Sequence, residues 1–597
     1  MRLIFSYLKN YKVMAIMAPL FKLMEVIFEL LVPKFVAQII NVGINGDAGW
    51  QYILVRCIIL VVFGIVGYAV GVVAQWFAAK AAVGVAKDLR ADMFRRIEAL
   101  SYADLDKAGT STLINRITND VNQIQTGVNM ILRLFLRSPI VVLGAMIMAF
   151  TVSWKAGVLF AVVICVLFAV VFAIMFVTMP MYKKVQGNMD GVTLATRETL
   201  AGSRVIRAFC KEEEEIENYN GKVDRLAKSQ KHVGRISALL NPLTYVIINL
   251  GIIALIYTGV LQFRSGELLQ GDIVELYNYM SQILIELIKV ANLVMIITKS
   301  LASSSRVQAV LDMKPSLKHA FAATGGTAEE GAAAGAPAAV AAVPAPVEGA
   351  PFVSFKNVCM KYSEGAECAI SDISFDAERG QTIGVIGGTG SGKTTLINLI
   401  PHFYDATEGE VAIDGVNVNA YPDEKLRELC GIVPQKAVLF RGTLRENMQW
   451  GDDKATDEDI YKALETAQAM DVVRAKEKGL DEPVEQMGKN FSGGQRQRLT
   501  IARALVKKPE ILILDDSASA LDYATDANLR KALKDLSFKP LVFIVSQRAS
   551  SVRNADKIIV LDGGKAVGIG THDELVKSCD VYKEICLAQY GMEGGAV

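Results

Sequence analysis

The chain has 597 residues, of which 52% are apolar, and its 63 lysines and arginines almost balance 62 aspartates and glutamates. This length exceeds that of one ordinary domain, and so large an apolar share with a positive mean hydropathy excludes a purely soluble protein. The net charge of +1 argues against bulk nucleic-acid binding, so no nucleic-acid partner is expected. The eight cysteines follow no ligand or pairing pattern and are expected to be reduced thiols in a cytoplasmic setting.

The N-terminal half contains apolar segments of about 20 residues or more, the length that a helix needs to cross a bilayer. Three segments are plainly apolar and three more are interrupted by charge. The six predicted spans are residues 13–40, 53–79, 127–154, 156–182, 236–263 and 273–297. No signal peptide with a small-residue cleavage site is visible, so the first span is expected to be retained. We therefore expect an all-α, six-helix membrane domain over residues 1–317.

The segments that connect the spans differ in length and charge. Residues 80–126 and 183–235 are long, helical in pattern and rich in lysine and arginine, whereas residues 41–51, 153–155 and 264–272 are short and nearly free of these residues. Because basic loops stay in the cytoplasm, the long segments and the N-terminus are predicted to be cytoplasmic. The sequence thus predicts a multi-pass protein of the plasma membrane whose long helices extend into the cytoplasm.

Glu25, Glu29, Glu286 and Lys289 are among the charged residues that fall inside the predicted spans. Charge within a membrane usually faces a cavity or a partner. These residues could form a polar lining that receives a cationic amphiphile. Alternatively, Glu286 and Lys289 are spaced to pair on one helix, and Glu25 or Glu29 could lie near a membrane interface or in a cytoplasmic extension.

Residues 318–350 consist mainly of alanine, glycine and proline with few charges. Such a composition cannot bury enough apolar side chain to fold, so we interpret the segment as a flexible linker. The domain that follows, residues 351–597, is predicted to be of the α/β class.

A glycine-rich loop marks the start of that domain's predicted chemistry. It follows the apolar strand of residues 382–386 and opens a helical run, which is the setting that favours a phosphate-binding loop. Backbone N–H groups and the helix N-terminus attract phosphate, Lys393 reaches the terminal phosphates and Thr394 can hold Mg²⁺. The residues predicted to bind phosphate are Gly387, Gly388, Thr389, Gly390, Ser391, Gly392, Lys393, Thr394 and Thr395.

Further motifs stand in a characteristic order around this loop. The buried-strand run of residues 511–514 ends in Asp515, which is placed to complete Mg²⁺ coordination. The D-loop, Ser519 to Asp522, follows this strand. The remaining motif residues are Tyr362, Gln435, Ser492, Gly493, Gly494, Gln495 and Asp522.

This order of motifs resembles the nucleotide-binding domain of ABC transporters, and the Ser-Gly-Gly-Gln signature is specific to that family. The resemblance implies an α/β P-loop ATPase domain with a helical signature subdomain, using ATP and Mg²⁺. In this family two such domains sandwich two ATP molecules, each held by one phosphate loop and the other domain's signature. The resemblance further implies that Tyr362 stacks on adenine, that Gln435 senses Mg²⁺ and the attacking water, and that Ser492 to Gln495 close over the partner's nucleotide.

Two positions depart from the family pattern. The residue after the Walker B aspartate is normally glutamate and here is Asp516, and the switch histidine is replaced by Gln547. Aspartate is one methylene shorter, so its carboxylate either falls short of the attacking water or must recruit a second water. General-base assistance contributes about 10² to 10⁴ in rate, or roughly 3 to 5 kcal/mol of barrier. Gln547 can donate and accept hydrogen bonds but cannot become cationic, so Asp516, Gln547 and Gln435 are expected to form a slow catalytic site. A tolerated amide in a working site is the alternative interpretation of Gln547.

The signature and D-loop are intact except that Phe491 replaces a common leucine. The chain therefore resembles the non-consensus-site subunit of bacterial heterodimeric multidrug ABC exporters, an exporter-type half-transporter. The expected partner is a second half-transporter with a Glu/His site, and the expected cargo is a hydrophobic or amphiphilic compound in contact with membrane lipid. A homodimer with two slow sites and an ATP-gated regulatory or channel-like subunit remain alternatives.

Two cytoplasmic segments also resemble parts of ABC exporters. The stretch from Asp104 to Asp120 resembles one that contains a coupling helix. The stretch from Arg204 to Phe209, followed by four glutamates, resembles the second coupling helix, which in exporters docks on the other subunit's ATP domain. An ordinary solvated helix face is the alternative interpretation of these docking residues.

Overall fold

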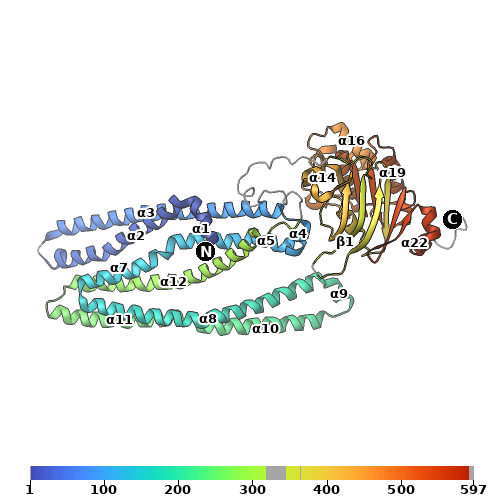
Figure 1. Cartoon of the computed structure of the whole chain (residues 1–597). Helices are drawn as coiled ribbons and strands as arrows, with labels where there is room; N and C mark the ends of the chain where they lie inside the picture. The colour runs from blue at the N-terminus through green and yellow to red at the C-terminus, as the bar shows by residue number, and fades with distance from the viewer. Residues whose placement is uncertain (1, 47, 318–344, 364, 591–597) are drawn as a thin grey trace. The chain divides into compact units, whose positions relative to one another are not determined.

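The computed structural model describes residues 2–46, 48–317, 345–363 and 365–590 (Figure 1). The chain divides into two compact units, one of residues 1–99 and 109–313 and the other of residues 100–108 and 314–597. Most of the predicted linker, residues 318–344, lies outside the described residues. Its end is already part of the second unit, because the Val347 N–H donates to the Asp414 carbonyl at 2.9 Å.

The first unit is helical throughout its described residues, and Figure 1 shows its long helices running alongside one another. The helices and their bounds are α1 Arg2–Leu8, η1 Lys9–Tyr11, α2 Lys12–Gln38, η2 Ile39–Ile44, α3 Gly49–Glu98, α5 Thr110–Asn115, η3 Arg116–Asp120, α6 Val121–Met130, η4 Ile131–Phe135, α7 Arg137–Val152, α8 Trp154–Ala201, α9 Ser203–Ala208, α10 Glu212–Ser237, α11 Leu240–Arg264 and α12 Gln270–Leu311. Large side chains such as Phe160, Leu255 and Tyr279 fill the core between α8, α11 and α12.

Among the described residues, four helical stretches are long and apolar enough to cross a membrane: Gly49–Glu98, Thr110–Val152, Trp154–Ala201 and Glu212–Arg264. The outward surface of α3 is apolar, with Val61, Ile65 and Tyr68 all exposed, as expected of a helix whose solvent is lipid. The other two predicted spans fall on α2 and α12, which carry Glu25, Glu29, Glu286 and Lys289. The count of six spans therefore remains a prediction.

Several charged residues of the predicted spans form ion pairs within the unit. Arg137 on α7 lies 2.7 Å from Glu29 on α2 and 3.3 Å from Glu286 on α12. Glu286 is only 2% exposed, pairs with Lys289 at 2.7 Å and accepts a hydrogen bond from Ser138 at 2.7 Å. The predicted Glu286–Lys289 pair on one helix is thus confirmed. Because charges in a low-dielectric interior require partners, this cluster also ties three helices together.

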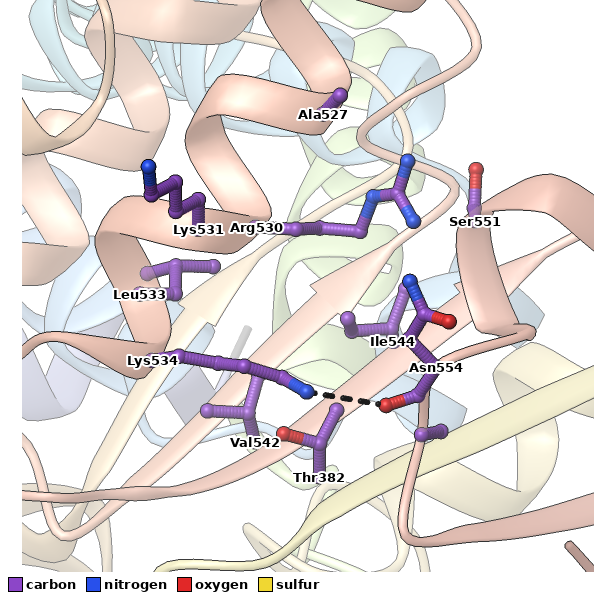
Figure 2. Close-up of a pocket in the computed structure, with 11 residues that line it drawn as sticks. Thr382, Ala527, Arg530, Lys531, Leu533, Lys534, Val542, Ile544, Ser551 and Asn554 are labelled. Carbon is purple, nitrogen blue, oxygen red and sulfur yellow. Dashed lines mark hydrogen bonds between the residues drawn. The ribbon is translucent and has the colours of Figure 1, made fainter.

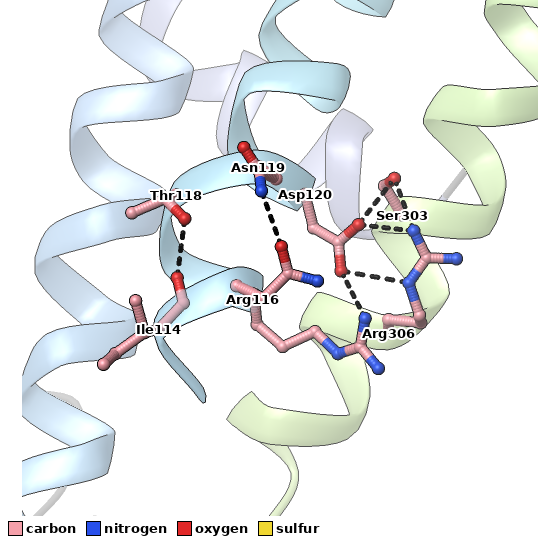
Figure 3. A network of polar contacts seen from close by, with 8 residues as sticks. Ile114, Arg116, Thr118, Asn119, Asp120, Ser303 and Arg306 are labelled. Carbon is pink, nitrogen blue, oxygen red and sulfur yellow. Dashed lines mark hydrogen bonds and ion pairs between the residues drawn. The ribbon is translucent and has the colours of Figure 1, made fainter. Parts of the chain in front are cut away.

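A second polar network joins α12 to the segment that precedes α6 (Figure 3). Asp120 accepts from Ser303 at 3.0 Å, from the Nε of Arg306 at 3.0 Å and from Arg116 at 2.8 Å. The Asp120 side chain is buried while Arg306 is partly exposed. Charge-assisted bonds of this kind are stronger than neutral ones, so this network fixes the register between the two segments.

The second unit contains two main sheets. A six-stranded sheet has the order β12-β11-β3-β10-β9-β6, parallel except for β12, and a four-stranded antiparallel sheet has the order β2-β1-β4-β5. The strands are β1 Val353–Met360, β2 Ile370–Ala377, β3 Thr382–Gly387, β4 Glu408–Ile413, β5 Val416–Asn417, β6 Cys430–Val433, β7 Gly442–Thr443, β8 Pro483–Val484, β9 Ile511–Asp515, β10 Leu541–Ser546, β11 Lys557–Asp562 and β12 Lys565–Gly570. Their β-branched and leucine side chains alternate into two cores, one on each face of the parallel sheet.

Helices cover the sheets, and two of them, α13 and α18, carry motif residues. They are α4 Tyr102–Ala108, α13 Lys393–Asn398, η6 Val418–Ala420, α14 Asp423–Leu429, α15 Leu444–Gln449, α16 Asp457–Thr466, α17 Met470–Arg474, η7 Gly479–Asp481, η8 Gln486–Gly488, α18 Gly493–Val506, α19 Tyr523–Lys534, α20 Ala549–Val552, α21 His572–Ser578 and α22 Asp580–Tyr590. Together the sheets and helices form an α/β domain, as the sequence predicts.

The short helix α4 lies in the second unit although the sequence on both sides of it belongs to the first. The ring of Tyr102 packs on Phe403 with 4.4 Å between centroids. The Tyr404 hydroxyl donates to Asp106 at 2.8 Å. The segment predicted to contain a coupling helix therefore packs against Phe403 and Tyr404, which follow the helix α13.

Directly before Phe403 lies a fully buried histidine. His402 contacts Asp405 at 2.8 Å and Asp423 at 3.6 Å. Burial alone would lower the pKa of His402, but the two carboxylates raise it to about 9. A protonated His402 therefore contributes to stability below the ordinary histidine pKa of about 6.5, and this contribution is lost as the pH rises towards 9.

As the pH rises from 6.5 to 9, we expect the thermal unfolding temperature of the purified protein to decrease. The free energy of unfolding should fall by about 2 to 4 kcal/mol over this range. His402→Asn, which tolerates the positive φ of 54° at this position, should remove most of this pH dependence. The matched control is His232→Asn on the exposed face of α10. An unchanged pH profile in His402→Asn would contradict the assignment.

Candidate functional site

The site is built at the carboxyl edge of the parallel sheet. Strands β3, β9 and β10 run in parallel register, with Val545 opposite both Val385 and Asp515. The residues that follow the strand ends therefore meet at one edge, where ligands of open α/β sheets usually bind. This register places the phosphate loop, Asp515 and Asp516, and the Gln547 segment side by side.

The glycine-rich loop turns tightly between β3 and α13. Gly390 and Gly392 have φ of 79° and 93°, a region that favours glycine. A Cβ on Gly387 would lie 2.1 Å from the Leu561 carbonyl, so the close approach of β11 also requires glycine there. The loop can thus present its backbone N–H groups to an anion at the N-terminus of α13.

Lys393 folds back over this loop. Its ammonium donates to the carbonyls of Gly387 and Gly388 at 2.9 and 2.6 Å. Burial lowers the pKa of Lys393, and the carboxylates of Asp516 and Asp515 oppose that shift. The Lys393 ammonium is therefore bound to neutral carbonyl groups, and phosphate oxygens can replace these as its acceptors.

Two hard oxygen donors meet beside the lysine. The Thr394 hydroxyl lies 3.0 and 3.2 Å from the carboxylate oxygens of Asp515. Burial raises the pKa of Asp515, the Thr394 bond opposes this, and the neighbouring Asp516 reinforces it. A hydroxyl and a carboxylate fit the oxygen preference of Mg²⁺, whose charge would relieve this clustering of carboxylates.

These groups line one cavity of about 330 Å³. Asp516 and Gln547, the two residues that depart from the family pattern, both face it together with Gln435 and Asp515. Tyr362 lies at its rim, half exposed, with its hydroxyl 2.8 Å from Thr395. The remaining lining residues are Ala369, Thr389, Gly390, Ser391, Gly392, Lys393 and Thr394.

Asp516 has a constrained backbone. Its φ is 44°, and its N–H donates to the Val545 carbonyl at 3.0 Å. Its carbonyl accepts from the Ser519 hydroxyl at 2.8 Å. Burial raises the pKa of the Asp516 carboxyl, whereas Gln435, Lys393 and Arg548 oppose that shift. Because hydrogen bonds fix the backbone on both sides, the main chain cannot shift to carry the short Asp516 side chain further into the cavity.

The segment carrying Gln547 is held from two directions. The side-chain amide of Gln589 on α22 donates to the Gln547 carbonyl at 2.7 Å and accepts from the Ala549 N–H at 2.8 Å. Between these two residues, Arg548 donates to the carbonyls of Ala518, Ser519 and Leu521 in and beside the D-loop. A single loop thus connects the C-terminal helix to the D-loop.

The signature residues lie outside this cavity. Ser492 caps α18, where its hydroxyl accepts from the Gln495 N–H at 3.3 Å and its own N–H donates to the Gln495 side chain at 2.9 Å. A Cβ on Gly494 would lie 2.9 Å from the Ala520 carbonyl, so glycine permits the D-loop to approach. Asp522 caps α19 through the Thr525 N–H at 2.9 Å. Phe491 is buried in the core below α18.

Sequence reasoning missed Gln589 and the role of Arg548 as a link to the D-loop. Gln589 belongs to no motif, and its two bonds to a loop 40 residues away in sequence have no periodic signal. Arg548 belongs to the switch motif, but the carbonyls that it binds depend on how two loops pack.

Comparison with known proteins supports this architecture. Residues 15–287 match the family model described as ABC transporter transmembrane region, and residues 370–519 match the one described as ABC transporter. The uncharacterized ABC transporter ATP-binding protein YfiB of Bacillus subtilis is 31% identical over 99% of this chain and 98% of its own. An ATP-dependent lipid A-core flippase of Bordetella avium is 31% identical over 92% of this chain and 90% of its own.

A solved structure of a bacterial Atm1-family ABC exporter with ATP bound has the same fold. The two superpose with a TM-score of 0.77 at 23% identity, over 98% of this chain and 99% of the other. The shared fold is a helical membrane domain followed by an α/β nucleotide-binding domain.

We predict that Gln589→Ala lowers the kcat for ATP hydrolysis by the purified transporter about two- to tenfold, because two hydrogen bonds of roughly 0.5 to 1.5 kcal/mol each no longer hold the loop. The KM for ATP should change little, since Gln589 does not line the cavity. Glu584→Ala, on an exposed position of the same helix, is the control. Equal kcat values for the two variants would refute a positioning role.

Proposed function

The chain belongs to the ABC transporter family as an ATP-hydrolysing exporter that passes the membrane several times, and we propose that it is the slow-site half of a heterodimer. In this proposal its own phosphate loop builds a site that hydrolyses ATP slowly. Its signature completes a fast site on a partner that carries glutamate and histidine. The observation that carries the proposal is that Asp516 and Gln547 together face the phosphate cavity.

The geometry of Asp516 supports a slow site. Its main chain is bonded on both sides, so the backbone cannot compensate for the methylene that aspartate lacks relative to glutamate. Burial raises the pKa of the Asp516 carboxyl, and Gln435 and Lys393 offset only part of that rise by stabilising the carboxylate form. Gln547 adds a neutral amide where a cationic group would stabilise charge on the terminal phosphate.

The remaining roles follow from position. We assign Mg²⁺ coordination to Thr394, Asp515 and Gln435, and phosphate binding to the loop from Gly387 to Thr395. Tyr362 is assigned to adenine because its exposed ring stands at the rim of the cavity. When bound, Mg²⁺ would polarise the terminal phosphate, while the residues of this chain position ATP and the attacking water.

The signature residues Ser492 to Gln495 and the D-loop residue Asp522 are assigned to the partner's ATP. Two observations support this. None of them lines the phosphate cavity of their own chain. They are ordered by their own capping bonds, so they are preorganised without nucleotide.

A surface of the first unit supports a dimer. Leu200, Val205 and Phe209, at the turn that joins α8, α9 and α10, are 72%, 60% and 73% exposed. Beside them is a largely apolar hollow of about 380 Å³ lined by Ile206, Ile216 and neighbouring residues. Exposed apolar patches of this kind mark interaction sites. We assign this patch, which matches the predicted second coupling helix, to docking on the partner's ATP-binding domain.

We further propose a lipid-like or amphiphilic cargo. Relatives named as lipid A-core flippases support this class. The cluster of Arg137, Glu29 and Glu286 places polar groups inside an otherwise apolar bundle. Glu29, whose side chain is 37% exposed, is the member that is open to a compound with both apolar and charged parts.

The proposed topology has six spans, with α2 and α12 as the first and last. Their charges are paired inside the unit, which makes insertion compatible with their composition. We place the N-terminus and the ATP-binding domain in the cytoplasm, with the membrane domain at residues 1–317, the linker at 318–350 and the nucleotide-binding domain at 351–597.

The composition of the transporter is the first test. Purified alone, the chain should hydrolyse ATP about 10² -fold or more below a consensus exporter, because general-base assistance is worth about 10² to 10⁴. Co-purification with a half-transporter that carries glutamate after its Walker B aspartate should restore fast turnover. Fast hydrolysis by a proven homodimer would exclude the heterodimer and leave the family assignment intact.

A repair experiment tests the two residues directly. Asp516→Glu with Gln547→His should recover part of the roughly 3 to 5 kcal/mol barrier that separates a slow from a consensus site. Each single change should recover less, because both groups act on one transition state and their effects need not add.

The repair must be measured where only this site can turn over. The partner's glutamate is therefore replaced by glutamine, and a partner with a consensus signature is chosen. The control is Lys393→Ala in the repaired chain, which should abolish the recovered rate. If the doubly repaired chain gains no turnover, the slowness does not come from these two side chains.

A further inference from the structure

The nucleotide-binding unit contains a second cavity, of about 240 Å³, that lies apart from the phosphate loop (Figure 2). It lies between α19, the segment that follows α20, and the strands β3 and β10. Thr382, the first residue of β3, lines it, whereas the phosphate loop begins at the other end of the same strand. At about 3.3 Å per residue, the two sites are separated by roughly 16 Å along β3.

The charge of this cavity is one-sided. Three of its 11 lining residues, Arg530, Lys531 and Lys534, are cationic and none is acidic. The Lys534 ammonium donates to the Asn554 main-chain carbonyl at 3.2 Å, as Figure 2 shows. Lys531 and Lys534 form no ion pair within the described part of the chain. The cavity therefore has a positive potential that an anion would neutralise.

Arg530 adds directional donors. It donates to the Ser550 carbonyl at 2.8 Å, contacts the Asp526 carboxylate at 3.2 Å and reaches the Asp526 carbonyl at 3.4 Å. A guanidinium has five N–H donors, so these three contacts leave two for a ligand. In Figure 2 the guanidinium extends from α19 towards Ser551 and Asn554.

The floor of the cavity is apolar. Leu533, Val542 and Ile544 come from the buried faces of α19 and β10 and are 6%, 5% and 8% exposed. An inorganic anion would satisfy the cations but leave this floor in contact with water. A ligand with a flat apolar body and one anionic head would satisfy both surfaces.

We propose that this cavity is a regulatory site for a small amphiphilic anion, with a carboxylate, sulfonate or phosphate head and an apolar body. The head binds Arg530, Lys534 and the side-chain amide of Asn554. Lys531 adds positive potential, and the body covers Val542 and Ile544. This inference holds for a homodimer as well as for the proposed heterodimer.

The position of the site explains how it would regulate turnover. Helix α19 begins at Tyr523, directly after its capping residue Asp522 of the D-loop, and α20 follows the segment that carries Gln547. Arg530 and Asp526 already join the two helices, because Ser551 donates to Asp526 at 3.1 Å and the Ser550 carbonyl accepts from Arg530. An anion on Arg530 and Asn554 adds a third bridge between them. It restrains the D-loop relative to the Gln547 segment and so slows the motions of the ATP cycle.

The test uses the purified transporter in lipid nanodiscs, with Mg-ATP in excess to occupy the phosphate loops. The probe is naphthalene-2-sulfonate, followed by saturation-transfer NMR and by ATP hydrolysis, with empty nanodiscs subtracted. We expect saturable binding and a two- to fivefold fall in turnover. Naphthalene-2-methanol, which lacks the charge, and inorganic phosphate, which lacks the body, should each bind at least tenfold more weakly.

Charge reversal locates the binding. Lys531→Glu/Lys534→Glu should weaken probe binding at least tenfold and abolish its effect on turnover. The matched control, Lys565→Glu/Lys577→Glu, changes the net charge equally at exposed positions of β12 and α21 and should bind like the wild type. Absent saturable binding, equal binding by both double variants, or binding that leaves turnover unchanged would each overturn the proposal.

Discussion

The parallel register of β3, β9 and β10 is the constraint on which the rest of the nucleotide-binding unit depends. Because Val545 stands opposite both Val385 and Asp515, three loops that are remote in sequence emerge at one edge. The same register fixes Asp516 through the Val545 carbonyl. The positions of Asp515, Asp516 and the Gln547 segment thus follow from the sheet, and a change of one side chain at this edge leaves the sheet unaltered.

The two units meet the cost of buried charge in different ways. In the helical bundle, Arg137 and Glu286 are satisfied permanently by one another and by Glu29, Lys289 and Ser138. At the phosphate loop, Lys393 rests on main-chain carbonyls and the carboxylates have raised pKa values. The first arrangement stabilises a structure, whereas the second keeps its polar groups available for a charged ligand.

The sequence predicted well what depends on local pattern. The phosphate loop, strand β9 and the long apolar helices each have a motif or a periodicity that can be recognised within about 20 consecutive residues. It could not predict that Arg137 joins Glu29 and Glu286, because that cluster depends on how three separate helices pack. Nor could it predict the Gln589 contacts, since an exposed glutamine near the end of a helix has no distinguishing pattern. Both omissions concern pairings between distant segments, which a single sequence does not encode locally.

Because α4 belongs to the nucleotide-binding unit, this unit is discontinuous in sequence. Residues 100–108 enter it from the helical unit and leave again, so the chain passes between the two units at three points. A protein cut only at the alanine-rich segment would lack Tyr102 and Asp106, and would expose the aromatic face of Phe403 and Tyr404 that they cover. A cut at this boundary alone therefore separates residues 100–108 from the unit to which they belong. Evolutionary exchange of one ATP-binding domain for another must also preserve a nine-residue insertion encoded more than 200 residues upstream.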